Sequence, residues 1–182
     1  MDEAAEQRAR RAAAQAEVGK HGRLIRGPRD GKLLSAGMLP WFRLRVPRGY
    51  GILTTTGRKT GLPRPKCVRV MRAGDRAYLV QLMPPQVTLD RPQAVNAWLR
   101  NVRADPRVTL ELRDGTHHGT AREITDPAEL EVARALLCDT VVPVDVGECA
   151  LHLRGLPSRA KIRALHEYWF RTGRAVAIDL AT

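Results

Sequence analysis

The chain has 182 residues, of which 43% are apolar and 27% charged, as in an ordinary globular protein of one domain with a buried core. No stretch approaches the roughly 18 apolar residues of a membrane span, and the N-terminus lacks the apolar core of a secretory signal. The three cysteines, Cys67, Cys138 and Cys149, are scattered without a Cys-x-x-Cys pair. This argues against a disulfide framework or a metal site and predicts a reduced, cytoplasmic protein.

The positive charge is confined to one part of the chain. The net charge is +12, and residues 1–72 carry 17 Lys and Arg against 5 Asp and Glu, whereas residues 73–182 carry 14 of each. A one-sided basic field attracts anions, so nucleic acid, an anionic membrane surface and a small polyanionic ligand are the partners to weigh.

Residues 1–48 are predicted to be a basic helical extension. Residues 3–17 favour helix by propensity but contain almost no large apolar residue, so we expect a frayed, solvated helix. A short helix is expected at about 32–39. The strand propensity of residues 49–56 is followed by a loop at 57–65, which contains two glycines, two prolines and three cations.

Residues 49–182 are predicted to form the main domain, in which turn signals join neighbouring strands. Asp114-Gly115 is a strong hairpin signal, and Asp126-Pro127 is typical of a helix start. The predicted elements are strands at 66–72 and 76–82, a Pro-bearing loop at 83–92, a helix at 93–104, strands at 107–113 and 117–125, a helix from 126 to about 138, an undefined stretch at 140–156, a helix from Ser158 to about Arg171, and a strand at 175–180. Hairpin connections favour an α+β fold with an antiparallel sheet curled into a small barrel.

The segment best suited to chemistry is the loop after the first strand. Gly57 and Gly61 permit positive φ, so backbone N–H groups can converge on an anion. Arg58 and Arg64 can make forked hydrogen bonds to phosphate or carboxylate, and Lys59 adds a point charge. The order of residues is not that of a P-loop. A solvated basic turn is the alternative interpretation.

Residues 53–65 resemble the signature of the deazaflavin-dependent nitroreductase family, the split β-barrel class of coenzyme F-420-dependent oxidoreductases of actinobacteria. Residues 97–108 resemble its tryptophan–asparagine helix and next strand, and residues 168–176 resemble its closing helix and strand. The resemblance implies a split β-barrel (an FMN-binding-like antiparallel barrel) with flanking helices, and a homodimer is plausible by the same resemblance.

The resemblance also implies a cofactor site and a reaction. Hydride would pass from reduced F-420 to an electron-poor small organic acceptor of the quinone, nitro or enone type, and the coenzyme's phosphate and oligoglutamate tail would explain the basic part of the chain. Thr55, Thr56, Gly57, Arg58, Lys59, Thr60 and Arg64 would hold the anionic part. Pro65, Lys66, Cys67 and Val68 would line the way to the ring, and Trp98 would pack near the tail.

Two segments depart from the family pattern. Residues 81–88 are apolar and Pro-rich where relatives carry glycines, and Ile162 and Leu165 stand where tyrosines are common. Tyr168 remains as a candidate proton donor, and Arg69 is a candidate substrate contact. These departures favour a second hypothesis, in which the barrel is repurposed for a non-redox rearrangement or cyclisation in natural-product biosynthesis, or binds flavin (FMN) or haem.

Other functions have weaker support. Nucleic-acid binding is disfavoured because aromatic residues are only 4% and no reading motif is recognisable. The N-terminal residues could contact an anionic membrane surface, although their apolar pattern is weak. The histidines lack metal-ligand spacing, so no metal site is expected.

Overall fold

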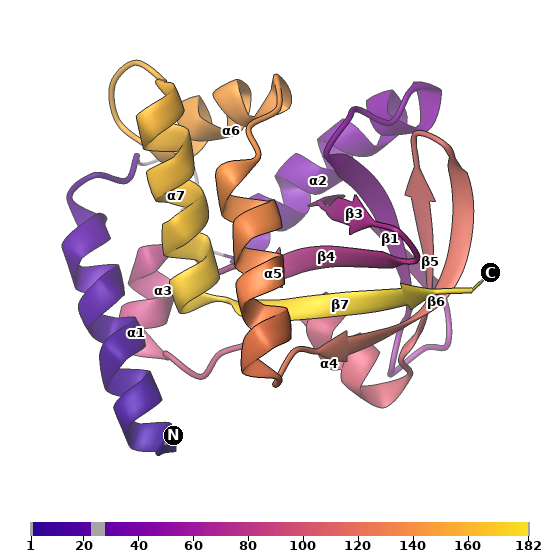
Figure 1. The fold of residues 1–182 in the computed structure, drawn as a ribbon, viewed down its shortest axis with the longest axis horizontal. Helices are drawn as coiled ribbons and strands as arrows, with labels where there is room; N and C mark the ends of the chain where they lie inside the picture. Colours follow the sequence, from indigo (N-terminus) through magenta and orange to yellow (C-terminus); the bar gives the residue numbers. More distant parts are fainter. Residues whose placement is uncertain (1, 23–27, 182) are drawn as a thin grey trace.

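The computed structural model describes residues 2–22 and 28–181, which form a curled sheet flanked by helices (Figure 1). The elements in chain order are α1 (Glu3–Val18), α2 (Pro28–Leu44), β1 (Tyr50–Thr56), β2 (Pro63–Arg69), β3 (Met71–Ala73), β4 (Arg76–Gln81), α3 (Pro85–Asp90), α4 (Ala97–Ala104), β5 (Arg107–Leu112), β6 (Gly115–Glu123), α5 (Pro127–Asp139), α6 (Val144–His152), α7 (Arg159–Thr172) and β7 (Arg174–Leu180).

The seven strands lie in the order β2-β1-β5-β6-β7-β4-β3, and every neighbouring pair is antiparallel. β2 and β3 stand at opposite ends of this order, yet only Val70 separates them in the chain. The sheet must therefore curl until its two ends meet. This confirms the predicted antiparallel barrel, and the α+β class is that expected from the sequence.

The outer edge of β2 is short of hydrogen-bond donors. Pro63 and Pro65 have no N–H group, and alternation places the N–H of Cys67 on the same edge. That N–H donates to the Ser35 hydroxyl of α2 at 2.9 Å. An exposed strand edge is a template for pairing with another chain, and this one is blocked by sequence and by a helix.

Two apolar layers hold the sheet. The first fills the barrel and includes Trp98 and Leu99 of α4, and the second packs the outer face against α2 and α5. Strand alternation divides side chains between the layers: Leu53 points into the barrel, whereas Tyr50 and Ile52 point out.

The prediction of a frayed, solvated α1 is wrong. α1 packs against α3 and α7 through Ala13 and Ala14, which are buried. Arg10 is also buried, pairs with Glu6 at 2.7 Å and donates to the backbone oxygen of Gly173 at 3.1 Å. The alanine side chains let α1 approach α3 and α7 closely, and the hydrogen-bonded Arg10 fills the rest of the contact. The prediction failed because it required large apolar residues on the buried face of α1.

Other boundaries differ by more than a residue or two. α2 is longer than the helix expected at 32–39, and the loop expected at 83–92 contains α3, which begins directly after Pro84. The undefined stretch at 140–156 contains α6. Within the described ranges, no helix is both long and apolar enough to cross a bilayer.

Candidate functional site

The cationic loop is a tight turn between β1 and β2. The Gly57 carbonyl oxygen accepts from the N–H groups of Thr60 and Gly61 at 3.0 and 2.7 Å, and the Gly57 N–H donates to the Leu62 carbonyl at 2.9 Å. Gly61 has φ of +67°, which favours glycine. The backbone thus closes on itself and directs the loop's cationic side chains outward.

Arg58, Lys59 and Arg64 are exposed, and no carboxylate among the described residues pairs with them. Arg64 donates instead to the Thr60 hydroxyl at 3.1 Å, which orients the guanidinium without neutralising it. By contrast, Arg72 and many other arginines of the chain form ion pairs. The loop therefore presents three uncompensated charges together.

Asn101 of α4 fixes this loop to the barrel. Its amide donates to the buried Thr55 hydroxyl at 3.1 Å, and its side-chain oxygen accepts from the Arg58 N–H at 3.3 Å. Sequence reasoning noted Asn101 only as part of a resemblance. Asn101 follows Trp98 by one helical turn, so it lies on the same buried face of α4, and this spacing could have indicated that its side chain points towards the barrel.

Gly57 has no room for a side chain. A Cβ there would lie 2.9 Å from the Thr60 hydroxyl oxygen, 3.0 Å from the Leu62 carbonyl oxygen and 3.1 Å from Arg64 Nε. A glycine at this position therefore keeps the turn compact. The exposed groups around the turn fit an anion, because two guanidinium groups, one ammonium group and the Thr60 hydroxyl lie together at the surface.

The four residues predicted to line the way to the ring do not share one face. Pairing with β1 places Lys66 and Val68 on the barrel side, opposite Leu53 and Gly51, and places Pro65 and Cys67 on the outer side. Cys67 packs towards α2, where its thiol lies 3.7 Å from the Ser35 carbonyl oxygen. Alternation of the strand decides this division, so the four residues cannot form a single lining.

The remaining predicted residues lie in or beside the barrel. Trp98 is buried in the barrel layer, on the same helix as Asn101. Thr56 is half-buried, and its hydroxyl lies near Asp105. The pKa of that carboxyl is lowered to about 2, chiefly by hydrogen bonds from Arg107.

The two catalytic candidates are both enclosed. Tyr168 is buried with its ring edge against His21 (centroids 5.1 Å apart), and burial raises the pKa of its hydroxyl to about 12. Arg69 donates to Asp145 at 3.1 Å and to the carbonyl oxygens of Leu137 and Thr140 at 2.8 and 2.7 Å. With these bonds its guanidinium joins β2 to α5 and α6.

A further ionisable group lies beside this ion pair. Glu148 of α6 is half-buried, but its Oε2 atom is enclosed without a hydrogen-bond partner. Desolvation raises the pKa of this carboxyl to about 7, and the Tyr50 hydroxyl lies near it. Burial also lowers the pKa of Lys66. Sequence reasoning left α6 undefined and therefore missed this group.

Most of the segment at 81–88 is packed inside the protein and does not line an open cavity edge. Met83, Pro84, Pro85, Val87 and Thr88 are all buried, and α1 packs over α3. Across the described part of the chain, no three His, Cys, Asp or Glu side chains are grouped to hold a metal ion.

Comparison with known proteins gives a family match. The profile of the F420H(2)-dependent quinone reductase family matches residues 45–143, which include β1, the loop and α4. Among solved structures, an F420-H2-dependent reductase (FDR-A) has 18% identity and a TM-score of 0.48 over 72% of this chain and 94% of its own. A domain-swapped dimer has 19% identity and a TM-score of 0.49 over 81% and 91%. A heme-binding protein from Mycobacterium smegmatis has 18% identity and a TM-score of 0.46 over 72% and 46%.

Proposed function

The chain belongs to the F420H(2)-dependent quinone reductase family and is therefore an F-420-dependent oxidoreductase. On this premise we propose that the turn between β1 and β2, together with Arg64 at the start of β2, holds the anionic part of the coenzyme. The observation that carries the proposal is the group of uncompensated cations, Arg58, Lys59 and Arg64, on a turn that lies within the matched segment.

Four residues of this segment and Asn101 of α4 have roles in the proposal. Arg58 and Arg64 bind carboxylate or phosphate oxygens with forked hydrogen bonds, and Lys59 adds charge. Gly57 lets the turn close, and Asn101 holds the Arg58 backbone in place. When bound, reduced F-420 supplies a hydride, so the protein must bind, orient and exclude water.

We propose a quinone-like or similarly electron-poor small molecule as the hydride acceptor. The family description favours a quinone, and the nitro and enone acceptors considered from the sequence remain the other members of this class. The non-redox barrel is the competing hypothesis, motivated by the closed, glycine-free segment at 81–88.

A binding titration tests the site. Arg58→Ala combined with Lys59→Ala should raise the Kd for F-420 at least tenfold, measured by fluorescence, because two charges that face the acidic tail are lost. Arg45→Ala with Arg113→Ala removes the same charge elsewhere and should leave the Kd unchanged. An equal loss in both double variants would assign the effect to net charge. FMN titrated in parallel separates the flavin hypothesis from the deazaflavin one.

Two expectations from the sequence remain predictions. A homodimer is tested by sedimentation velocity at several protein concentrations. Cytoplasmic location is tested by fractionating the cells that make the protein.

A further inference from the structure

Glu148 of α6 carries a half-buried carboxyl group outside the proposed coenzyme loop. Its Oε2 atom is enclosed and finds no hydrogen-bond partner among the described residues. The guanidinium of Arg69 cannot serve as that partner, because all three of its nitrogens donate to Asp145 and to two backbone carbonyl oxygens. Oε2 is therefore an enclosed polar atom whose hydrogen-bonding capacity the protein does not use.

The Tyr50 hydroxyl determines which form of this carboxyl is favoured. A hydroxyl that donated to Glu148 would lower its pKa, but the Tyr50 hydroxyl, which lies near Glu148, donates its one proton to Asp145 at 2.8 Å. Asp145 also accepts from Arg69 at 3.1 Å, which holds it as a carboxylate. Towards Glu148 the Tyr50 oxygen therefore offers only lone pairs, and these favour a protonated carboxyl over an ionised one.

The charged groups around Glu148 act in both directions. Desolvation and the negative charge of Asp145 raise the pKa of Glu148 to about 7, although the positive charges of Arg69 and Lys66 oppose the rise. His166 of α7 lies 3.8 Å from Asp145 and is the remaining titratable group of this cluster in the described part of the chain. A carboxyl balanced in this way can release a proton and take it back at neutral pH, as a general acid must.

Glu148 lies beside the strand that leads away from the proposed anion site. Arg64 and Lys66 are two residues apart on β2, or about 6–7 Å, and strand alternation directs both side chains to the same face. The Lys66 ammonium group interacts electrostatically with Glu148. Lys66 therefore links the anion site at Arg64 to the region of the Glu148 carboxyl.

We propose that Glu148 is the acid that protonates the hydride acceptor, an inference that rests on the proposed reductase function. Hydride uptake from the reduced coenzyme leaves a negative charge on an oxygen of a quinone-like acceptor. That oxygen takes the proton as the O–H bond of the Glu148 carboxyl breaks. The products are a hydroquinone, the coenzyme oxidised by two electrons, and a Glu148 carboxylate, which the charge of Lys66 stabilises until water returns the proton.

A titration of the protein without coenzyme tests the acid itself. In protein labelled with ¹³C at the glutamate side-chain carboxyl, one NMR resonance should titrate with a midpoint of about 7 and be missing in Glu148→Gln. Lys66→Met should move that midpoint upward, because a positive charge that favours the carboxylate is lost. A Glu148 midpoint below about 5, close to that of an ordinary glutamate, would overturn the proposal.

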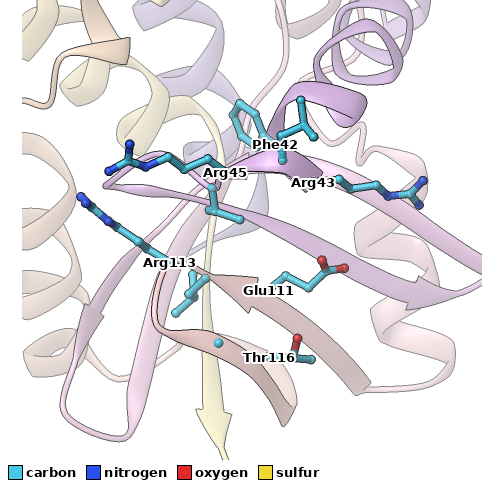
Figure 2. A pocket seen from close by; sticks show the side chains of 10 residues that line it. Phe42, Arg43, Arg45, Glu111, Arg113 and Thr116 are labelled. Carbon is cyan, nitrogen blue, oxygen red and sulfur yellow. The ribbon is translucent and has the colours of Figure 1, made fainter.

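Glu111 of β5 supplies the matched control. It is half-buried like Glu148, and Figure 2 shows its side chain at an open hollow of about 400 Å³ between the end of α2 and the β5–β6 hairpin. Glu111→Gln therefore removes the same chemical group from a place that water can reach. This variant should leave the neutral-pH resonance, the rate of quinone reduction and the Kd for F-420 unchanged.

Single-turnover kinetics tests the proton transfer. Protein loaded with reduced F-420 is mixed with a soluble quinone, and oxidation of the coenzyme is followed by absorbance. The wild-type rate should be constant below the Glu148 pKa of about 7 and fall about tenfold per pH unit above it, because the acid loses its proton. Glu148→Gln should be roughly 100-fold slower or more and lack this pH dependence, while its Kd for F-420 stays within about twofold.

The possible results separate this proposal from the proposed function. If Glu148→Gln oxidises the coenzyme at the wild-type rate and with the wild-type pH profile, Glu148 is not the proton donor and the reductase function stands. A variant that is slow but keeps the wild-type pH profile would also overturn the proposal, because the loss would then be structural. If the wild-type protein neither binds nor oxidises reduced F-420, both the proposed function and the proton donor are wrong.

Discussion

The ion pair between Arg69 and Asp145 offers a quantitative test of how α6 is held. Asp145 is fully enclosed and accepts from Arg69 Nε at 3.1 Å, from the Tyr50 hydroxyl at 2.8 Å and from the Val142 N–H at 2.8 Å. Asp145→Asn preserves the shape of the side chain but removes the charge that the guanidinium faces. An uncompensated buried charge costs about 3–5 kcal/mol, so the free energy of unfolding should fall by that amount and the Tm by roughly 6–20 °C.

A double-mutant cycle separates the pair from its surroundings. Arg69→Met, Asp145→Asn and their combination are compared by urea unfolding followed through tryptophan fluorescence. The double variant should be more stable than the sum of the singles predicts, with a coupling of at least about 1.5 kcal/mol. The same cycle on the exposed pair Arg72–Asp114 should give less than about 1 kcal/mol. Additive losses at the buried pair, within about 0.5 kcal/mol, would refute this account.

Three further predictions concern the loop, a histidine and a helix cap. Gly57→Ala should raise the Kd for F-420 several-fold in the fluorescence titration, because a Cβ would press on the Thr60 hydroxyl oxygen 2.9 Å away. Burial lowers the pKa of His152 to about 4, so the unfolded state binds a proton that the folded state excludes. Stability should therefore fall by up to about 3 kcal/mol as pH decreases from about 6.5 to 4, and unfolding of His152→Gln should lack that part of the slope. Asp126→Ala removes the cap on the Glu129 N–H (2.8 Å) and should cost about 0.5–2 kcal/mol in urea unfolding.

Local signals predicted much of the fold. The predicted hairpin between β5 and β6 is confirmed, although its turn is Arg113-Asp114, because Gly115 already pairs with Leu112 as the first residue of β6. Asp126 and Ser158 are the N-caps of α5 and α7, because a side-chain oxygen before a helix satisfies an otherwise free N–H group. Such features are fixed by a few neighbouring residues and can therefore be recognised in the chain alone.

The missed features depend on contacts between distant residues. Arg69 and Asp145 lie 76 positions apart, and neither carries a pattern that announces its partner. α1 is held by small residues and by Arg10, so its buried face does not look apolar in the sequence. At the loop, residue types indicated the cations, but only the fold brings Asn101 to the backbone of Arg58.

The outer edge of β2, which lacks free hydrogen-bond donors at residues 63, 65 and 67, limits how this protein can associate with others. Two prolines offer no donor there, and the N–H of Cys67 is already taken by Ser35. A strand from a neighbouring molecule would find too few partners to extend the sheet at this rim. Any self-assembly on this side must therefore proceed through side chains, and its specificity should respond to surface substitutions rather than to backbone register.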